Sequence, residues 1–495
     1  MHAAARQGLC LIGNIRLRRR FIHRVALGRV AAITAGAILL SGCHPDDFVA
    51  SLTHPIPEHF DLNKSTTPPH VSRWWTKFGS NELDRLMDEA NFENLDIALA
   101  VAQLDQADAQ AGVAGAPLWP QLNYAGNNQR TRTSGTSVPG IISPATERNS
   151  FSRVINASYV VDLWGQNRAL LDAALHTANA SAYQVEVVRL TTRASVVNNF
   201  LTLAANRERV AVAEENLANA ERILQVIRER VGAGTASALD LAQQESLVAT
   251  QRASIPPLRQ AAETARTALA LLLGRPPQGF RLKTRSARGL RLPKVSPGMP
   301  SALLVRRPDV RNAEQALESA DANVYAARKA FFPTITLTGQ AGFQSALLST
   351  LFRPESFIYT IAAGVAQPIF QGHKLKAQLA LNEAQRRGLL ETYRKSIVSA
   401  LTDVENALIA IRENMLREAA QRVVIEKSRA AFNLSEQRLR EGTIDLTTLL
   451  AVQTTLFQAE DLLIQIRLTR LQAVVSLFQA IGGDWDETVV LFPHE

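Results

Sequence analysis

Two long segments without helix-breaking residues limit what this chain can fold into more than any other feature. Between Gln166 and Val231 there is no proline or glycine, and between Lys374 and Glu441 there is only Gly388. Because an α-helix rises about 1.5 Å per residue, each segment predicts a helix of roughly 100 Å. A compact domain cannot enclose rods of this length, so the sequence predicts an elongated, mainly helical structure.

The two segments belong to an internal duplication. Gly234-Thr235 lies 208 positions before Gly442-Thr443, and Gly274 lies 208 positions before Gly482. Apolar and small residues three and four apart form a coiled-coil seam before each glycine turn. The seam comprises Val210, Ala213, Leu217, Ala220, Leu224, Ile227 and Val231 in the first copy, and Ile425, Ser428, Phe432, Ser435 and Leu439 in the second. Two seams at one spacing predict duplicated helical hairpins.

Glycines mark the point where each rod reverses direction. Gly232, Gly234 and Gly442 supply the permissive backbone that a tight reversal after a helix requires. We expect a returning helix after each turn. In the first copy Pro256-Pro257 interrupt the returning segment. Because proline lacks a backbone N–H, this pair predicts a break in the helix.

A period of two residues precedes each rod. From Pro333 to Phe343, apolar and small residues alternate with threonine and glutamine, which is typical of a β-strand. Its expected partner is Phe357 to Gln367. The first copy has a matching pair, Leu122 to Asn128 and Phe151 to Asp162. A long exposed loop is expected between these two strands, from Gln129 to Ser150.

Four strands per chain cannot close a barrel in lipid, because transmembrane barrels need eight or more strands and lipid tolerates no open sheet edge. The hairpins are entered through aromatic-proline steps ending at Pro120 and Pro333, and they are left through Trp164-Gly165 and Phe370 to Gly372. Aromatic residues favour the membrane–water interface. These corners indicate a membrane barrel shared by several chains, with hydrophobic corners of a soluble sheet as the alternative.

The amino-terminal segment predicts export and lipid attachment. Residues 1–42 hold seven arginines and no acidic residue, and their apolar run from Val30 to Leu40 is too short for a permanent transmembrane helix. The tetrad LSGC then matches a bacterial lipobox, so we expect Cys43 to be acylated and to begin the mature chain. A chance cysteine after an ordinary signal peptide is the alternative.

Cysteine, histidine and charge content exclude several function classes. The other cysteine, Cys10, lies in the leader, so no disulfide is expected in the mature chain, and the nine histidines lack zinc-site spacing. Taking the seven leader arginines from the 54 basic residues leaves 47 against 45 acidic residues, which argues against nucleic-acid binding. Without a phosphate-binding loop or nucleophile motif, the sequence predicts no enzyme and no cofactor besides the lipid on Cys43.

Four stretches occur in order along the mature chain after the lipobox. They are "WWTKFGSNELDRLMDEA" (Trp74 to Ala90), "PSALLVRRPDVRNAEQAL" (Pro300 to Leu317), the paired Gly-Thr turns, and "TTLLAVQTTLFQAED" (Thr447 to Asp461). With them the chain resembles the outer-membrane factor family, the TolC-type exit ducts, and particularly its NodT-type efflux lipoproteins. The resemblance implies a homotrimer with a shared twelve-stranded β-barrel in the outer membrane and a coiled-coil tunnel in the periplasm.

The resemblance also implies the function and the partners. The chain would be a passive exit duct for small molecules such as drugs in a tripartite efflux system. Its partners would be a periplasmic adaptor (membrane fusion protein) and an inner-membrane RND-type pump. Two alternatives stay open: the duct of a type I protein secretion system, which differs in the pump, and a non-conducting, lipid-tethered coiled-coil scaffold.

The turns after the long rods are the candidate functional site, because the resemblance places them at the periplasmic tip. The adaptor-facing candidates are Gly232, Gly234, Thr235, Gly442 and Thr443. Many family members carry a lumen-facing carboxylate after the second turn, and the position aligned with it here is Ala451. Asp240, Asp445 and Thr447 complete the candidate gate region, although a solvated helix surface is the alternative for both aspartates.

Two further motifs predict structural roles. Pro308 fits the first position of a helix and Asp309 complements its dipole, while Trp74 and Trp75 are expected to pack the N-terminal arm against the helices.

The predicted segments are a lipoprotein signal peptide (1–42), a lipidated N-terminal arm (43–80), a first helical segment (81–119), a first β-hairpin (120–163), a first long-helix repeat (164–274), a linker (275–300), a helix (301–332), a second β-hairpin (333–371), a second long-helix repeat (372–482) and a C-terminal tail (483–495).

Overall fold

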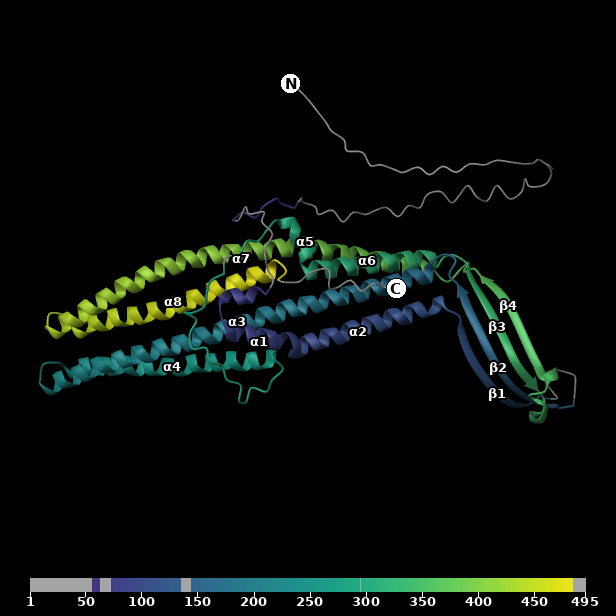
Figure 1. Ribbon diagram of the computed structural model, residues 1–495, viewed down its shortest axis with the longest axis horizontal. Helices are drawn as coiled ribbons and strands as arrows, with labels where there is room; N and C mark the ends of the chain where they lie inside the picture. The colour runs from purple at the N-terminus through teal and green to yellow at the C-terminus, as the bar shows by residue number, and fades with distance from the viewer. Residues whose placement is uncertain (1–55, 63–72, 135–143, 294, 484–495) are drawn as a thin grey trace, which may run out of the picture. The chain divides into compact units, whose positions relative to one another are not determined.

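The computed structural model describes residues 56–62, 73–134, 144–293 and 295–483. The leader and Cys43, on which the predicted export and lipidation depend, lie outside the described residues. The described part belongs to one unit and is mainly helical, with one small sheet (Figure 1). Within it the sheet lies at one end of the long helices and the two helix turns lie at the other (Figure 1).

The two long rods are continuous helices. They are α3 (Gln166–Gly232) and α7 (Lys374–Arg440), each 67 residues long and therefore about 100 Å. The returning helices α4 (Ala238–Leu272) and α8 (Leu446–Ala480) have 35 residues each. Helices α7 and α8 begin and end 208 positions after α3 and α4, so the predicted rods and duplication are confirmed.

The break predicted at Pro256-Pro257 is wrong, because α4 runs through both prolines. The two rings lie on the exposed side of the helix, whereas Ile255 beside them is buried. Carbonyls that lose their helical N–H partner on this side are accessible to water. Packing of the opposite side against α3 holds the helix together across the prolines.

Shorter helices precede each sheet hairpin. These are α1 (Asn81–Glu93), α2 (Leu95–Gly115), α5 (Leu303–Arg306) and α6 (Pro308–Lys329), together with the 3₁₀ turns Trp74–Phe78, Ala116–Leu118 and Pro300–Ala302. Two further 3₁₀ turns, Leu348–Thr350 and Pro354–Ser356, lie inside the second hairpin. Helices α2 and α6 begin 213 positions apart, as do the first strands after them, at Gln121 and Thr334. The duplication thus extends to the whole of each helix–hairpin–rod module.

The sheet contains four antiparallel strands in the order β1-β2-β3-β4, so β1 and β4 are its edges. The strands are β1 (Gln121–Arg132), β2 (Glu147–Val161), β3 (Thr334–Ser345) and β4 (Phe357–Ala366). Leu122 pairs with Ala157, Tyr159 with Leu337 and Ile335 with Val365. All four predicted strands are confirmed.

The first hairpin is longer than predicted, and its loop is correspondingly shorter. The expected loop from Gln129 to Ser150 is wrong at both ends, because β1 continues to Arg132 and β2 starts at Glu147. An ion pair between Arg130 and Glu147 and a 3.0 Å backbone bond from Thr133 N to Thr146 O extend the ladder. These polar residues carry no apolar alternation, so the sequence pattern ends earlier than the strands do.

The main hydrophobic core lies where the N-terminal arm meets α3 and α8. The Trp74 ring is fully buried and stacks on Phe478, with 4.8 Å between ring centroids. Trp75 and Phe78 are buried in the same cluster as Phe200 of α3. The predicted packing role of Trp74 and Trp75 is therefore confirmed.

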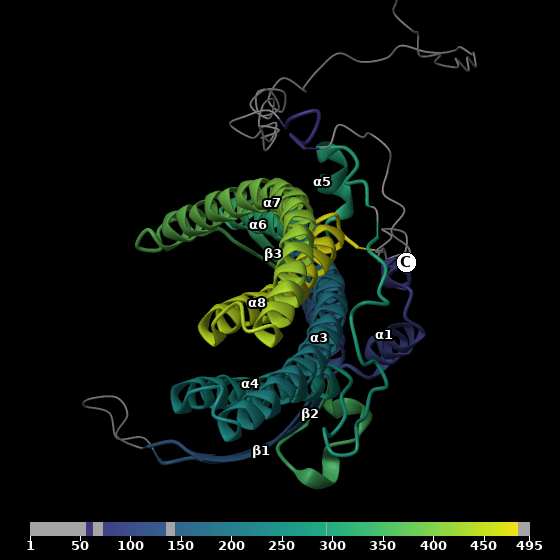
Figure 2. The same ribbon diagram turned by 90° about the vertical axis from the view of Figure 1, so that its left-hand side faces the viewer.

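The four long helices form a curved row in the order α7, α8, α3, α4 (Figure 2). The middle contact joins the two hairpins, because α8 packs against α3. A second core near the turns contains Ile223, Ile227, Phe432, Leu439, Leu446, Leu449 and Leu456. The predicted seam residues Ile227, Phe432 and Leu439 are buried there, so the seam joins three helices.

Candidate functional site

The turn after α3 is a Schellman motif built around one glycine. Gly234 has a φ of 73°, which is the left-handed region that glycine occupies without strain. The Thr235 backbone N–H donates to the Arg230 carbonyl at 2.8 Å, and its hydroxyl donates to the same oxygen at 3.1 Å. The end of α3 is thus capped by Ala233, Gly234 and Thr235, which are all exposed.

The turn after α7 repeats this geometry. Gly442 also has a φ of 73°, and Thr443 donates from its N–H and its hydroxyl to the Arg438 carbonyl at 2.9 and 3.1 Å. A Cβ atom added at Gly232, Gly234 or Gly442 would meet nothing within 4 Å. The predicted adaptor-facing residues are all exposed. The permissive backbone is required at Gly234 and Gly442, whereas the prediction for Gly232 is wrong, because Gly232 is the last residue of α3 and has no positive φ.

The two candidate gate carboxylates cap the returning helices. Asp240 accepts a hydrogen bond from Ser237 N at 2.9 Å, while Ser237 caps α4 in return. Asp445 is the N-cap of α8 and accepts from Thr448 N at 2.9 Å. Hydrogen bonds from the Thr448 side chain and backbone lower the pKa of Asp445. Both carboxylates therefore start helices at the tip.

The remaining candidate gate residues lie on the first turns of α8. Thr447 and Ala451 are both exposed, and Ala451 carries no polar side chain. The structure thus brings Gly442, Thr443, Asp445, Thr447 and Ala451 together at one turn. Gly232, Gly234, Thr235 and Asp240 form the equivalent group at the other turn.

A set of polar contacts joins the two tips, and the sequence analysis missed it. The Arg230 guanidinium donates to the carbonyls of Leu439 and Arg440 at 2.8 and 3.0 Å. These are the last carbonyls of α7, which no longer have helical partners and attract positive charge. Arg222 on α3 also pairs with Glu436 on α7 at 2.5 Å, and this hydrogen bond lowers the pKa of Glu436.

Two more polar ties lie farther from the tips. Arg209 on α3 forms a bidentate ion pair with Asp461 on α8, with N–O distances of 2.6 and 3.0 Å. Buried Glu418 on α7 binds Arg470 on α8 at 2.8 Å and Arg422 at 2.6 Å. Arg209 and Asp461, like Glu418 and Arg470, lie too far apart in sequence for spacing to reveal them, and the repeat does not reveal them either, because alanine stands at the positions equivalent to Asp461 and Arg470.

One polar side chain is buried in the seam without a partner. Gln453 of α8 has no exposed surface, and neither atom of its amide group is hydrogen-bonded within the described residues. Leu449 and Leu456, one turn away on either side, belong to the seam core. An unsatisfied buried amide weakens the packing around it.

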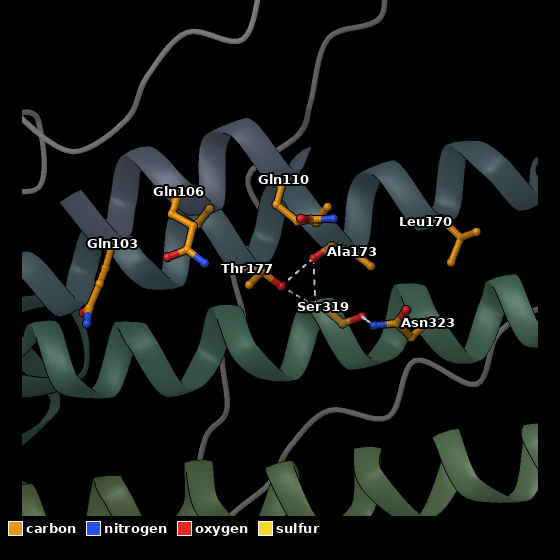
Figure 3. A pocket seen from close by; sticks show the side chains of 10 residues that line it. Gln103, Gln106, Gln110, Leu170, Ala173, Thr177, Ser319 and Asn323 are labelled. Carbon is orange, nitrogen blue, oxygen red and sulfur yellow. Dashed lines mark hydrogen bonds between the residues drawn. The ribbon is translucent and has the colours of Figure 1, made fainter. Parts of the chain in front are cut away.

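A polar groove of about 480 Å³ lies between α2, α3 and α6 (Figure 3). The Thr177 and Ser319 hydroxyl oxygens lie 3.0 Å from each other and 2.9 and 2.8 Å from the Ala173 carbonyl oxygen, and their two protons serve two of these three contacts. The lining residues are Gln103, Gln106, Ala107, Gln110, Leu170, Ala173, Ala174, Thr177, Ser319 and Asn323. None is ionisable, so this groove offers no acid–base chemistry.

The sheet exposes apolar and aromatic residues. Tyr359, Ile361 and Val365 of edge strand β4 are 72%, 84% and 71% exposed. At the base of the sheet, Trp164 stacks on Phe332 at 5.1 Å and donates from Nε1 to the Pro333 carbonyl at 2.7 Å. None of the described helices has a stretch that is both apolar and long enough to span a bilayer.

Comparison with known proteins gives one family. The family described as outer membrane efflux protein matches residues 86–275 and 299–483, which is more than half of the chain. The pyoverdine export outer membrane protein OpmQ of Pseudomonas aeruginosa is 38% identical over 459 residues, covering 92% of this chain and 96% of that protein. OpmQ of Pseudomonas putida is 39% identical over 416 residues, covering 83% of this chain and 88% of that protein.

The solved structures give the same result. The outer-membrane channel OprN superposes with a TM-score of 0.82 at 25% identity, covering 88% of this chain and 98% of that one. The sequence resemblance and the efflux function it implied are confirmed by these matches. This chain therefore belongs to the outer membrane efflux protein family.

Proposed function

We propose that three copies of this chain assemble into one outer-membrane channel. The observation that carries the proposal is the sheet, which has two unpaired edges, β1 and β4, and exposed apolar side chains. In lipid each unpaired backbone group costs several kcal/mol, so the edges must find partners. Pairing β4 of one copy with β1 of the next removes every edge and closes a barrel of twelve strands.

The helices support the same assembly. The row α7, α8, α3, α4 is curved and leaves α7 and α4 as its free flanks (Figure 2). Three such rows, joined flank to flank, enclose a tunnel continuous with the barrel. We place this helical part in the periplasm and the lipid on Cys43 in the outer membrane, with no further cofactor.

The channel would conduct passively, and an inner-membrane pump with a periplasmic adaptor would drive transport. The exposed turns at Gly234 and Gly442 are the surface proposed to meet the adaptor, and Asp240, Asp445, Thr447 and Ala451 are the proposed gate region. The cargo proposed first is pyoverdine or a similar small molecule, because two relatives are named for pyoverdine export. Protein secretion through the same duct is the second candidate.

Three measurements test this function. We expect a trimeric mass in detergent, conductance in planar bilayers, and loss of small-molecule export in a deletion strain. A monomer that leaves bilayers impermeable would refute the channel. Loss of a secreted protein with unchanged small-molecule export would favour the second candidate.

The lipid anchor has its own test. Replacing Cys43 by serine should abolish incorporation of labelled palmitate, because serine lacks the thiol that is acylated. Palmitate in that variant would refute the assignment of Cys43.

A further inference from the structure

The two copies of the module place equivalent arginines at their tips. Arg230 lies two residues before the end of α3, and Arg438 lies two residues before the end of α7. Both helices have 67 residues and end in turns with the same glycine φ and the same threonine hydrogen bonds. The two arginines therefore leave equivalent backbones in equivalent positions.

Their environments differ within one chain. Arg230 donates to the Leu439 and Arg440 carbonyls at the end of α7. The Arg438 side chain is exposed and has no hydrogen-bond or ion-pair partner within the described residues. Its equivalent acceptors, 208 positions before Leu439 and Arg440, are the carbonyls of Val231 and Gly232 at the end of α3.

The order of the helices says where those acceptors lie. Within one chain α8 packs against α3. The repeat equivalents of α8 and α3 are α4 and α7, which are the two free flanks of the row. The equivalent contact therefore forms between α4 of one copy and α7 of the next. Val424 on that flank of α7 is 43% exposed, whereas its α3 equivalent, Asn216, is 5% exposed.

Of the three polar contacts between the hairpins described above, only the one made by Arg230 has its residue types repeated. The counterparts of Arg209 and Asp461 are Arg417 and Ala253, so that ion pair is lost. Arg222 and Glu436 correspond to Ala430 and Arg228, which cannot pair either. The bond from arginine to helix-end carbonyls survives, since it requires only one arginine and a backbone.

We infer that Arg438 binds the Val231 and Gly232 carbonyls of α3 in the adjacent subunit. The tip of the trimer then carries six arginine contacts, three within chains and three between them. Each places a guanidinium on the negative end of a helix, where one carbonyl, that of Leu439 or Val231, already accepts a backbone N–H of the turn and the other is the last carbonyl of the helix. The inference rests on the proposed trimer, because the arginine and its acceptor carbonyls come from two different subunits.

Cysteine cross-linking separates the two kinds of contact. The test pair is Arg438→Cys with Ala233→Cys, and the matched pair from the other repeat is Arg230→Cys with Glu441→Cys. The chain has only two cysteines of its own, one of them in the leader, so the background is low. Each full-length variant is treated in outer membranes with a short bismaleimide and run on a denaturing gel.

We expect covalent dimers and trimers from the Arg438/Ala233 pair and only internally linked monomers from the Arg230/Glu441 pair. Native mass in detergent is measured on the same samples. A trimer in which the Arg230/Glu441 pair reacts but the Arg438/Ala233 pair gives no covalent dimer would overturn the inference alone. A monomeric native mass would overturn the proposed channel together with it.

Discussion

Four glycines end the long helices, and their surroundings predict different responses to the same substitution. Gly234 and Gly442 at the tips face open space. Gly274 and Gly482, at the ends of α4 and α8, lie against the backbone carbonyls of Glu93 and Arg306. A Cβ added at Gly274 would lie 2.5 Å from the Glu93 carbonyl oxygen, although its φ of 63° resembles that of Gly234.

The cost of alanine follows from these contacts. At Gly234 the substitution carries only the left-handed backbone penalty, about 1–2 kcal/mol. At Gly274 the Glu93 carbonyl must also move, and overpacking of this kind adds about 1–3 kcal/mol. That shift disturbs the neighbouring bond from Asn94 Nδ2 to the Leu272 carbonyl, which measures 2.7 Å. We expect Gly274→Ala to cost about 2–5 kcal/mol in all.

The assay is urea unfolding of each variant in detergent, followed by far-ultraviolet circular dichroism at one protein concentration. The concentration is fixed because association shifts apparent stability. Gly274→Ala should have a clearly lower midpoint than Gly234→Ala, which serves as the matched control for the φ penalty. Equal midpoints for the two variants would refute the reasoning from backbone contact.

Three further predictions concern the tip, the seam and acid. Gly442→Val should impair adaptor-dependent export before it impairs trimer assembly, because valine strains the turn; normal export would mean that the turns do not meet the adaptor. Gln453→Leu should raise the free energy of unfolding by about 1–3 kcal/mol, and with it the urea midpoint, since it removes an unsatisfied buried amide. An unchanged midpoint would contradict this. Burial alone would raise the pKa of Glu418, but hydrogen bonds from Arg470 and Arg422 outweigh this effect, so the pKa lies below its ordinary value of 4.5. The stabilisation from Glu418 is therefore complete above pH 4.5 and lost as the pH falls through the lowered pKa, and Glu418→Gln should flatten that part of the stability profile.

Long-range patterns were readable in the sequence, and solvent-dependent details were not. The rods were predictable because a proline- and glycine-free span with a seam has one regular solution, and the strands because alternation fixes their faces. Pro256-Pro257 misled the prediction because a proline pair breaks a helix only where its lost hydrogen bonds cannot be replaced, and which side faces water depends on packing. The loop after β1 was overestimated because polar strand ends resemble loops.

The candidate site was predicted in position more than in chemistry. Spacing placed Gly234 and Gly442 at turns, because a left-handed cap leaves a glycine in the sequence. It did not assign Asp240 and Asp445 to helix caps, since a carboxylate near a turn fits a cap and a pore equally well. Arg230 was missed because its acceptors are main-chain carbonyls, which leave no mark on the residue types that supply them.

The same absence of a residue signature explains how the two copies could diverge while keeping one geometry. At the end of α4, Asn94 donates to the Leu272 carbonyl, and at the end of α8, Arg307 donates to the equivalent Ala480 carbonyl at 3.3 Å. Asn94 is the N-cap of α2, and Arg307 is the N-cap of the equivalent helix α6. A neutral amide needs nothing more, whereas a buried guanidinium needs counter-charges, and Asp309 and Asp403 supply them at 2.6 and 2.9 Å. The backbone carbonyl is thus common to both copies. Asp309 has an aspartate, Asp96, at the equivalent position of the first copy, whereas Asp403 has Ser195, so the second counter-charge occurs only in the copy that buries a guanidinium.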